Sequence, residues 1–180
     1  GMHLDGLADT CDGLAASYDR ERALAVMRTG DVGPAGAAAI AIVLLIDLAA
    51  LAALLGSWRG TLLAAVAVVA SRHALAWVCR VGVPSARGEG LGATVAGSVT
   101  TAYAVLGAVV VAAAGGAAVV AAGGRWWSAL VVVAAALVVA IALARRATSR
   151  LGGITGDVLG AGIELGLAVA LASATVVVAA

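Results

Sequence analysis

Five long apolar runs dominate this 180-residue sequence and determine the kind of fold it can adopt. A helix needs roughly 20 mostly apolar residues to cross the hydrocarbon core of a bilayer. The runs have about that length and fall at residues 35–55, 61–78, 94–114, 128–144 and 158–179. Because they are continuous rather than alternating, they favour helices over a transmembrane β-barrel. We therefore predict an all-α, polytopic integral membrane bundle with about five transmembrane helices.

The composition agrees with a membrane protein and excludes several other classes. Hydrophobic residues make up 63% of the chain and charged residues 12%. Soluble domains average about 45–50% and about 25%, respectively. Such a chain is too apolar for an ordinary soluble domain or a disordered one, and it lacks the basic face of a nucleic-acid-binding protein. We treat residues 1–180 as a single membrane domain, with residues 1–34 as a cytoplasmic segment that carries a motif.

The arginines are distributed unevenly between the two ends of the predicted helices. If residues 1–34 lie on one side of the membrane, that side also receives the loops 80–93 and 145–155. It then carries eight of the eleven arginines, at positions 20, 22, 28, 80, 87, 145, 146 and 150. By the positive-inside rule this side is cytoplasmic. We therefore expect a multi-pass protein of the inner (plasma) membrane whose polar segments face the cytoplasm.

Three aspartates near the start of the chain, Asp5, Asp9 and Asp12, lie four and three residues apart in the segment HLDGLADTCDGL. On a helix they would share one narrow stripe, where they repel one another and raise one another's pKa values. A divalent cation relieves that repulsion, and oxygen ligands suit Mg²⁺ or Mn²⁺. The alternatives are a solvated acidic helix face and helix N-capping near Gly6 and Gly13.

A second polar motif, GGITGDVLGAGIELG at residues 152–166, leads into the last apolar run. Its two acids, Asp157 and Glu164, are seven residues apart and would share a helix face. A glycine-rich turn before a helix binds phosphate through backbone N–H groups, and Asp157 indicates a cation between the two. Close helix packing is the alternative for the glycines and N-capping the alternative for Asp157. Glu164 is a functional candidate because ionisable groups are costly inside a bilayer.

Arginines and a histidine complete the set of polar candidates. Arg87 lies in the loop PSARGEGLG, and three more arginines, Arg145, Arg146 and Arg150, precede the glycine-rich turn. A guanidinium group can bind two phosphate oxygens through bidentate hydrogen bonds. The positive-inside rule alone also explains arginines at this end of the helices. His73 lies in the second apolar run, where a hydrogen-bonded core histidine is the alternative to a functional one.

Acids, arginines and glycines gathered at one membrane face suit the transfer of a phosphate-bearing group. Carboxylates hold a metal that bridges a diphosphate, arginines neutralise the remaining charge, and an alcohol attacks one phosphorus. The apolar bundle implies that one substrate is held at the membrane.

Four motifs in this order, HLDGLADTCDGL, MRTGDVGPAGA, PSARGEGLG and GGITGDVLGAGIE, resemble those of the cobalamin synthase family over essentially the whole chain. The family's activity is that of adenosylcobinamide-GDP ribazoletransferase, in the last assembly step of the nucleotide loop of coenzyme B12. The resemblance implies that α-ribazole, or its 5′-phosphate, attacks adenosylcobinamide-GDP with Mg²⁺, giving adenosylcobalamin (or its phosphate) and GMP. Family members carry several tens of residues before the first motif, including another span, so we expect this chain to be truncated at its N-terminus.

The resemblance also implies roles for particular residues. We expect Asp9, Asp12 and Asp157 to hold Mg²⁺ at the cytoplasmic mouth. Asp5 would complete the metal site or accept the ribazole hydroxyl proton, and Glu164 and His73 are rivals for that proton. The catalytic candidates are thus the carboxylates Asp5, Asp9, Asp12 and Asp157. The substrate-binding candidates are Arg87, Arg145, Arg146, Arg150, Gly153, Gly156, Glu164 and His73.

Two other functions stay open at the level of sequence. The acidic motifs partly resemble the DxxDGxxAR and GxxxDxxxD patterns of CDP-alcohol phosphotransferases, but Ser17 and Ala161 stand where an Arg and the last Asp are expected. A non-catalytic small-solute transporter is the other alternative, because Asp47 and Arg72 fall within the predicted spans. The expected partners are adenosylcobinamide-GDP, α-ribazole and the lipid bilayer, with no nucleic acid and with a homo-oligomer left open.

Overall fold

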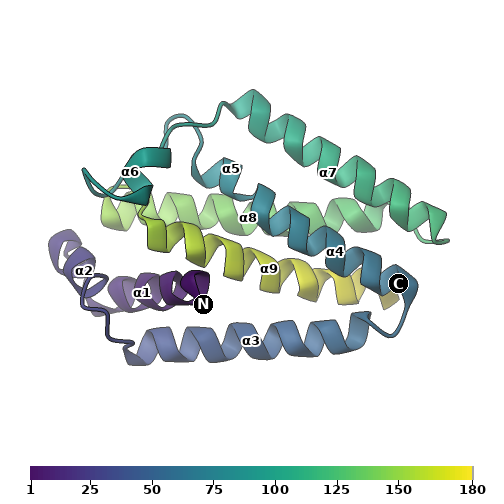
Figure 1. Cartoon of the computed structure of the whole chain (residues 1–180), viewed down its shortest axis with the longest axis horizontal. Helices are drawn as coiled ribbons and strands as arrows, with labels where there is room; N and C mark the ends of the chain where they lie inside the picture. The colour runs from purple at the N-terminus through teal and green to yellow at the C-terminus, as the bar shows by residue number, and fades with distance from the viewer. Residues whose placement is uncertain (180) are drawn as a thin grey trace.

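The computed structural model describes residues 1–179, and within that range the chain folds into helices joined by turns and loops (Figure 1). Five helical segments are long and apolar enough to cross a membrane, which confirms the predicted all-α bundle with about five spans. The five segments are α3 (Pro34–Leu54), α4 (Trp58–His73) continued by α5 (Leu75–Val78), α7 (Thr101–Ala121), α8 (Trp126–Leu151) and α9 (Gly156–Ala179). The remaining helices are α1 (Met2–Ala16), α2 (Arg20–Val26) and α6 (Leu91–Val95).

The third spanning helix lies further along the chain than the predicted run 94–114. α7 begins at Thr101 because the Thr100 side chain accepts a hydrogen bond from the Tyr103 backbone N–H at 3.3 Å, which caps the helix. The helix then continues through Gly115 and Gly116 to Ala121. A Cβ at Gly115 would lie 2.7 Å from Cγ2 of Val66, so this glycine allows α7 to pack closely against α4.

Helix α9 is the central element of the bundle. It packs against α1, α3, α4 and α8. Its buried face is built largely from small residues, which let helix backbones approach closely in a membrane. These residues include Gly160, Ala161, Gly162, Gly166, Ala168, Ala170 and Ala174. The outer helices instead expose large apolar side chains such as Leu45 and Leu48 in α3, as expected of surfaces that face lipid.

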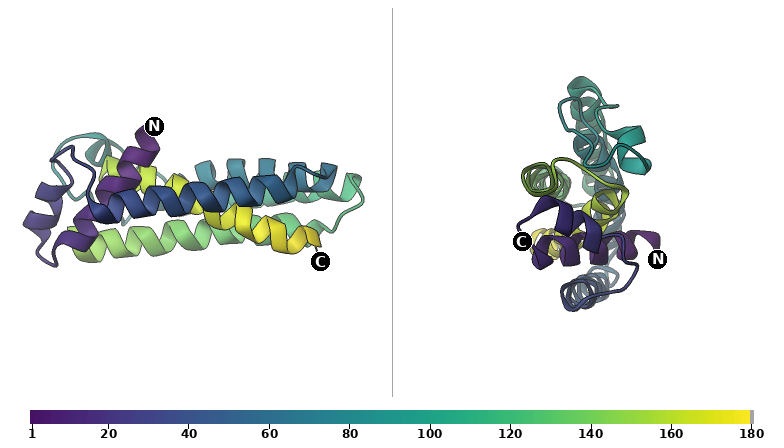
Figure 2. Two further views of the ribbon diagram at one scale, coloured as in Figure 1. Left: turned by 90° about the horizontal axis from the view of Figure 1, so that it is seen from below. Right: turned by 90° about the vertical axis from the view of Figure 1, so that its left-hand side faces the viewer.

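The polar segments gather at one end of the bundle. α1 runs obliquely across the long helices at this end, and α2, α6 and the turn between α8 and α9 lie beside it (Figures 1 and 2). The turns that join α3 to α4 and α7 to α8 lie at the other end. We call the end that holds α1, α2 and α6 the arginine-rich end, because it carries the eight arginines that the sequence places on one side of the membrane.

The loop after α5 is fixed to the turn between α8 and α9 by a short backbone pairing. The Ala86 N–H donates to the Ile154 carbonyl and the Ile154 N–H donates to the Pro84 carbonyl, both at 2.9 Å. Gly153 makes this pairing possible, since a Cβ there would lie 2.6 Å from the Ala86 nitrogen and closer still to the Ser85 carbonyl carbon. Its φ of +155° is also one that favours glycine. The pairing places the segment that carries Arg87 next to the start of α9.

We expect Gly153→Ala to lower the free energy of unfolding by about 2 kcal/mol, because the added methyl group forces the paired backbones apart. Thermal unfolding of the detergent-solubilised full-length protein measures this. Gly156→Ala is the matched control, since a Cβ there would make only an ordinary 3.5 Å contact with Leu91. Equal unfolding temperatures for the two variants would contradict the assigned packing.

Candidate functional site

Glycines allow the two acidic motifs to meet where α1 crosses the start of α9. A Cβ at Gly6 would lie 2.8 Å from the backbone oxygen of Asp157 and 3.0 Å from its Cα. From the other side, a Cβ at Gly160 would lie 3.0 Å from the backbone oxygen of His3. The segments 5–12 and 153–164, remote in sequence, therefore pack against each other at the arginine-rich end.

Three other carboxylates lie within electrostatic reach of Asp9 at this crossing. Burial raises the pKa of Asp9 to about 6, and the neighbouring charges of Asp157, Asp5 and Asp12 add to that increase, while the Arg87 guanidinium opposes it. We call Asp5, Asp9, Asp12 and Asp157 the acidic cluster. The single positive charge of Arg87 cannot neutralise the negative charge of these four carboxylates.

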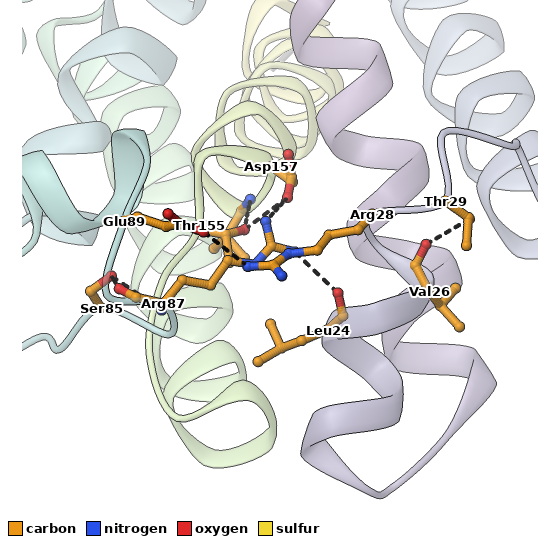
Figure 3. A network of polar contacts seen from close by, with 10 residues as sticks. Leu24, Val26, Arg28, Thr29, Ser85, Arg87, Glu89, Thr155 and Asp157 are labelled. Atoms are coloured by element: carbon orange, nitrogen blue, oxygen red, sulfur yellow. Dashed lines mark hydrogen bonds and ion pairs between the residues drawn. The ribbon is translucent and has the colours of Figure 1, made fainter.

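Arg87 links the acidic cluster to α2. Its Nη1 lies 3.6 Å from Oδ2 of Asp157, and its Nη2 donates a hydrogen bond to the Leu24 carbonyl at 3.2 Å (Figure 3). Both members of the ion pair are mostly buried. Arg28 lies beside them and pairs with Glu89 at 3.7 Å near the surface. Arg87 is therefore the predicted substrate-binding arginine that the structure places against the acids.

Asp12 stabilises the start of α3, a structural role that the sequence analysis did not predict. Its Oδ2 accepts a hydrogen bond from the Gly33 N–H at 2.7 Å and its Oδ1 one from the Gly36 N–H at 2.9 Å. Asp12 thus caps α3, whose own cap residue, Gly33, has no side chain to do so. The sequence analysis offered N-capping near Gly6 and Gly13 as the alternative to metal binding. Asp12 does act as an N-cap, but it caps α3, which begins more than twenty residues later in the chain. The metal-binding role of Asp12 stays a prediction.

Thr155 caps α9, and the sequence analysis did not single it out. Its Oγ1 accepts a hydrogen bond from the Val158 N–H at 3.3 Å and donates one to Oδ2 of Asp157 at 3.2 Å. The Thr155 side chain is buried. Since Thr155 supplies the cap, the Asp157 carboxylate is turned toward Arg87 and remains available at the crossing (Figure 3). A threonine three residues before Val158 was the available sequence signal.

The other predicted arginines lie in different surroundings. Arg150 donates from Nη2 to the carbonyls of Ser17 at 2.7 Å and Leu14 at 3.4 Å, and its guanidinium lies 4.0 Å from the centre of the Tyr18 ring. It therefore holds the C-terminal end of α1 against α8. Arg145 and Arg146 are both exposed, and Arg145 also lines a separate cavity on α8. The substrate-binding roles of these three arginines stay predictions.

His73 and Glu164 lie apart from the acidic cluster. Nε2 of His73 lies 2.9 Å from the Ala104 carbonyl, so this side chain joins α4 to α7 as the core-histidine alternative describes. Glu164 faces α1, with Oε1 at 3.4 Å from Nδ1 of His3. Asp47 lies within electrostatic reach of both Glu164 and Arg72. The structure brings neither His73 nor Glu164 into contact with Asp9 or Asp157.

Of the predicted glycines, Gly153 serves the backbone pairing described above, and Gly156 opens α9 with room around it. Next to Arg87 there is a cavity of about 740 Å³, a size typical of small-molecule sites. Its walls come from α2 and the loop 86–89 and include Glu21, Arg28, Arg87 and Glu89. The cavity offers space for a large polar ligand beside the acidic cluster.

The acidic cluster fits a divalent cation by the chemistry of its donors. Within residues 1–179, no three His, Cys, Asp or Glu side chains are already arranged as a complete set of metal ligands. Mg²⁺ commonly uses only one or two carboxylates, with waters and substrate phosphates as its other ligands. Asp9 and Asp157, which lie within electrostatic reach of each other, supply carboxylates of this kind.

The fold and the site together define a class: a polytopic helical membrane protein with carboxylates, an arginine and a cavity lined by charged side chains gathered at one end of the bundle. The chain matches the family described as CobS, cobalamin-5-phosphate synthase, over residues 1–175. The protein belongs to that family.

Curated relatives agree with this assignment. The chain is 46% identical over 170 residues to a protein of a Nocardioides species and 42% identical over 178 residues to one of Frankia casuarinae. It is 40% identical over 169 residues to a protein of Citrobacter koseri. These alignments cover 94%, 95% and 92% of the chain, and each relative is named adenosylcobinamide-GDP ribazoletransferase. The chain spans 64% of the length of the first two relatives and 65% of the third. No solved structure matches it.

We expect Asp12→Ala to lower the free energy of unfolding by about 2 kcal/mol, because it leaves the N–H groups of Gly33 and Gly36 without acceptors. Thermal unfolding in detergent measures the loss. Asp5→Ala removes the same charge from an exposed side chain and serves as the control. If both variants unfold at the same temperature, Asp12 does not cap α3.

Proposed function

We propose that this protein transfers the cobinamide phosphate group of adenosylcobinamide-GDP to α-ribazole or its 5′-phosphate. The ribazole hydroxyl oxygen forms a bond to the phosphorus that carries cobinamide, the bond from that phosphorus to the GMP oxygen breaks, and GMP leaves. The products are GMP and adenosylcobalamin or its 5′-phosphate. The observation that carries the proposal is the meeting of Asp9 and Asp157 beside Arg87 and a cavity of about 740 Å³. The family and the names of the curated relatives support it.

The acidic cluster would hold the metal and take up the proton. Asp9 and Asp157 would bind Mg²⁺, with Asp12 as a further ligand through the lone pairs that its two backbone contacts leave free. When bound, Mg²⁺ would neutralise diphosphate charge and stabilise the charge that develops during transfer. Asp5 is exposed at the edge of the cluster, so its carboxylate is placed to accept the proton of the ribazole hydroxyl.

Arg87 and the cavity beside it would bind the diphosphate end of the substrate. The Arg87 guanidinium is already oriented by Asp157 and by the Leu24 carbonyl, so little rotational freedom is lost when phosphate oxygens replace one of these partners. Arg28, on the same cavity wall, pairs with Glu89 at the surface and would supply a second guanidinium group when a phosphate displaces that carboxylate. Two arginines on one wall suit a ligand with two adjacent phosphates.

The arginine-rich end would face the cytoplasm of a cell with an inner membrane. This orientation follows from the positive-inside rule, since the other end of the bundle carries only Arg59, in the first turn of α4, and Arg125, the residue before α8. GMP and the GDP group of the substrate are charged and water-soluble, so they would reach the site from the aqueous side. The apolar bundle would hold the site at the membrane surface.

We expect Asp9→Asn and Asp157→Asn each to lower kcat of the full-length protein by at least about 100-fold, because each removes a negative charge that the metal requires. Release of GMP from adenosylcobinamide-GDP in the presence of α-ribazole and Mg²⁺ measures the rate. Asp19→Asn is the matched control, since Asn retains the capping of α2 while losing the charge.

Turnover near the wild-type rate in both site variants at saturating Mg²⁺ would exclude the proposed metal site. The same assay with a CDP-alcohol in place of the corrinoid substrate separates the proposed reaction from that of a CDP-alcohol phosphotransferase. Activity with the CDP-alcohol alone would overturn the proposed substrate.

A further inference from the structure

A second cavity, of about 350 Å³, lies at the arginine-rich end between α8 and the turn that follows α5. The side chains that matter for its chemistry are those of Trp77, Arg80, Arg145, Thr148 and Ser149. It shares no lining residue with the cavity beside Arg87 or with the acidic cluster. The reaction proposed above assigns no role to the residues that line this cavity.

Two buried hydrogen-bond donors in this cavity lack an acceptor. Nε1 of Trp77 and Nε of Arg80 are both buried and make no hydrogen bond within the described part of the chain. Buried polar groups in proteins are almost always paired, and an unpaired donor costs free energy. The Arg80 guanidinium lies 5.5 Å from the centre of the Trp77 ring, so a cation–π contact orients the two groups relative to each other.

The cavity is positively charged and is not neutralised by the protein. The ion pairs found among residues 1–179 involve His3, Arg28 and Arg87, so neither Arg80 nor Arg145 has a carboxylate partner there. Thr148 donates its hydroxyl proton to the Ala144 carbonyl at 2.8 Å, and Ser149 adds a second hydroxyl to the same wall. Two guanidinium groups and an indole N–H form a set of donors for an anion with several oxygens.

The depth of the cavity points to the lipid headgroups. α8 has 26 residues and is therefore about 39 Å long, whereas the hydrocarbon core is about 30 Å thick. The surplus of about 9 Å corresponds to about six residues, so with Trp126 at the far boundary of the core Arg145 lies at the near boundary and Ser149 beyond it, at the arginine-rich end. Trp77 lies in the last turn of its own span, at the level where tryptophans favour the interface. Below these groups, Ile141 and Ala144 form an apolar wall.

We propose that Trp77, Arg80 and Arg145 form a pocket that binds a phosphate group at the depth of the lipid headgroups. The phosphodiester of an anionic phospholipid fits the pocket with its acyl chains along the apolar wall. A soluble phosphate ligand shares the recognition chemistry and is the alternative source. In either case the bound phosphate joins the turn after α5 to α8 and supplies the acceptors that Trp77 and Arg80 lack. The proposal does not depend on the reaction proposed above.

Native mass spectrometry of the detergent-solubilised full-length protein tests this pocket. The ligands are phosphatidylglycerol, a diacylglycerol that lacks phosphate, and inorganic phosphate as a competitor. We expect phosphatidylglycerol to bind with saturation at one site and diacylglycerol not to bind. Arg145→Ala and Arg80→Ala should each weaken phosphatidylglycerol binding by about tenfold. Arg22→Ala, which removes an exposed arginine at the same end of the bundle, should leave it unchanged.

Trp77→Phe separates the pocket from the general packing of α5. It keeps an aromatic ring under Arg80 but removes the indole N–H, so we expect binding to weaken by about fivefold while the unfolding temperature stays close to that of the wild type. Competition by inorganic phosphate that is lost in the same variants would also support the pocket, with a soluble ligand as its source. Binding that does not saturate, or that is equal in Arg145→Ala, Trp77→Phe and Arg22→Ala, would overturn the proposal.

Discussion

The carboxylates of Asp9 and Asp157 repel each other at the crossing of α1 and α9, and the surrounding structure holds them together. Gly6 and Gly160 let the two helix backbones approach closely enough for the acids to meet. Burial raises the pKa of Asp9, and the repulsion from Asp157 raises it further. One arginine, Arg87, offsets part of this charge. A site that retains excess negative charge under these conditions is suited to a divalent cation.

Several contacts that seem unrelated in sequence serve this crossing. Asp12 caps α3 and so fixes the last turns of α1 against the first span, while Arg150 binds the carbonyls of Leu14 and Ser17 and fixes the same C-terminal end of α1 to α8. The backbone pairing at Gly153 brings the loop of Arg87 to the start of α9. The arginine-rich end is therefore a connected framework, in which α1 and the loop are held on either side of Asp157.

The spans and the two acidic motifs could be predicted because they depend on local pattern. Apolar length predicts a spanning helix, and helical spacing predicts that Asp5, Asp9 and Asp12 share a stripe. The start of α7 was predicted too early because apolar residues precede the cap at Thr100. The capping of α3 by Asp12 and the contact of Arg150 with α1 depend on how remote helices are placed, and local spacing carries no such information. The unpaired donors of Trp77 and Arg80 likewise appear only in three dimensions.

The most direct test is the position of Mn²⁺, used in place of Mg²⁺, in crystals of the full-length protein, located by its anomalous scattering. The account predicts a peak within coordination distance of carboxylate oxygens of both Asp9 and Asp157, with Arg87 adjacent. A peak at another site, or carboxylates of Asp9 and Asp157 too far apart to share one ion, would contradict it.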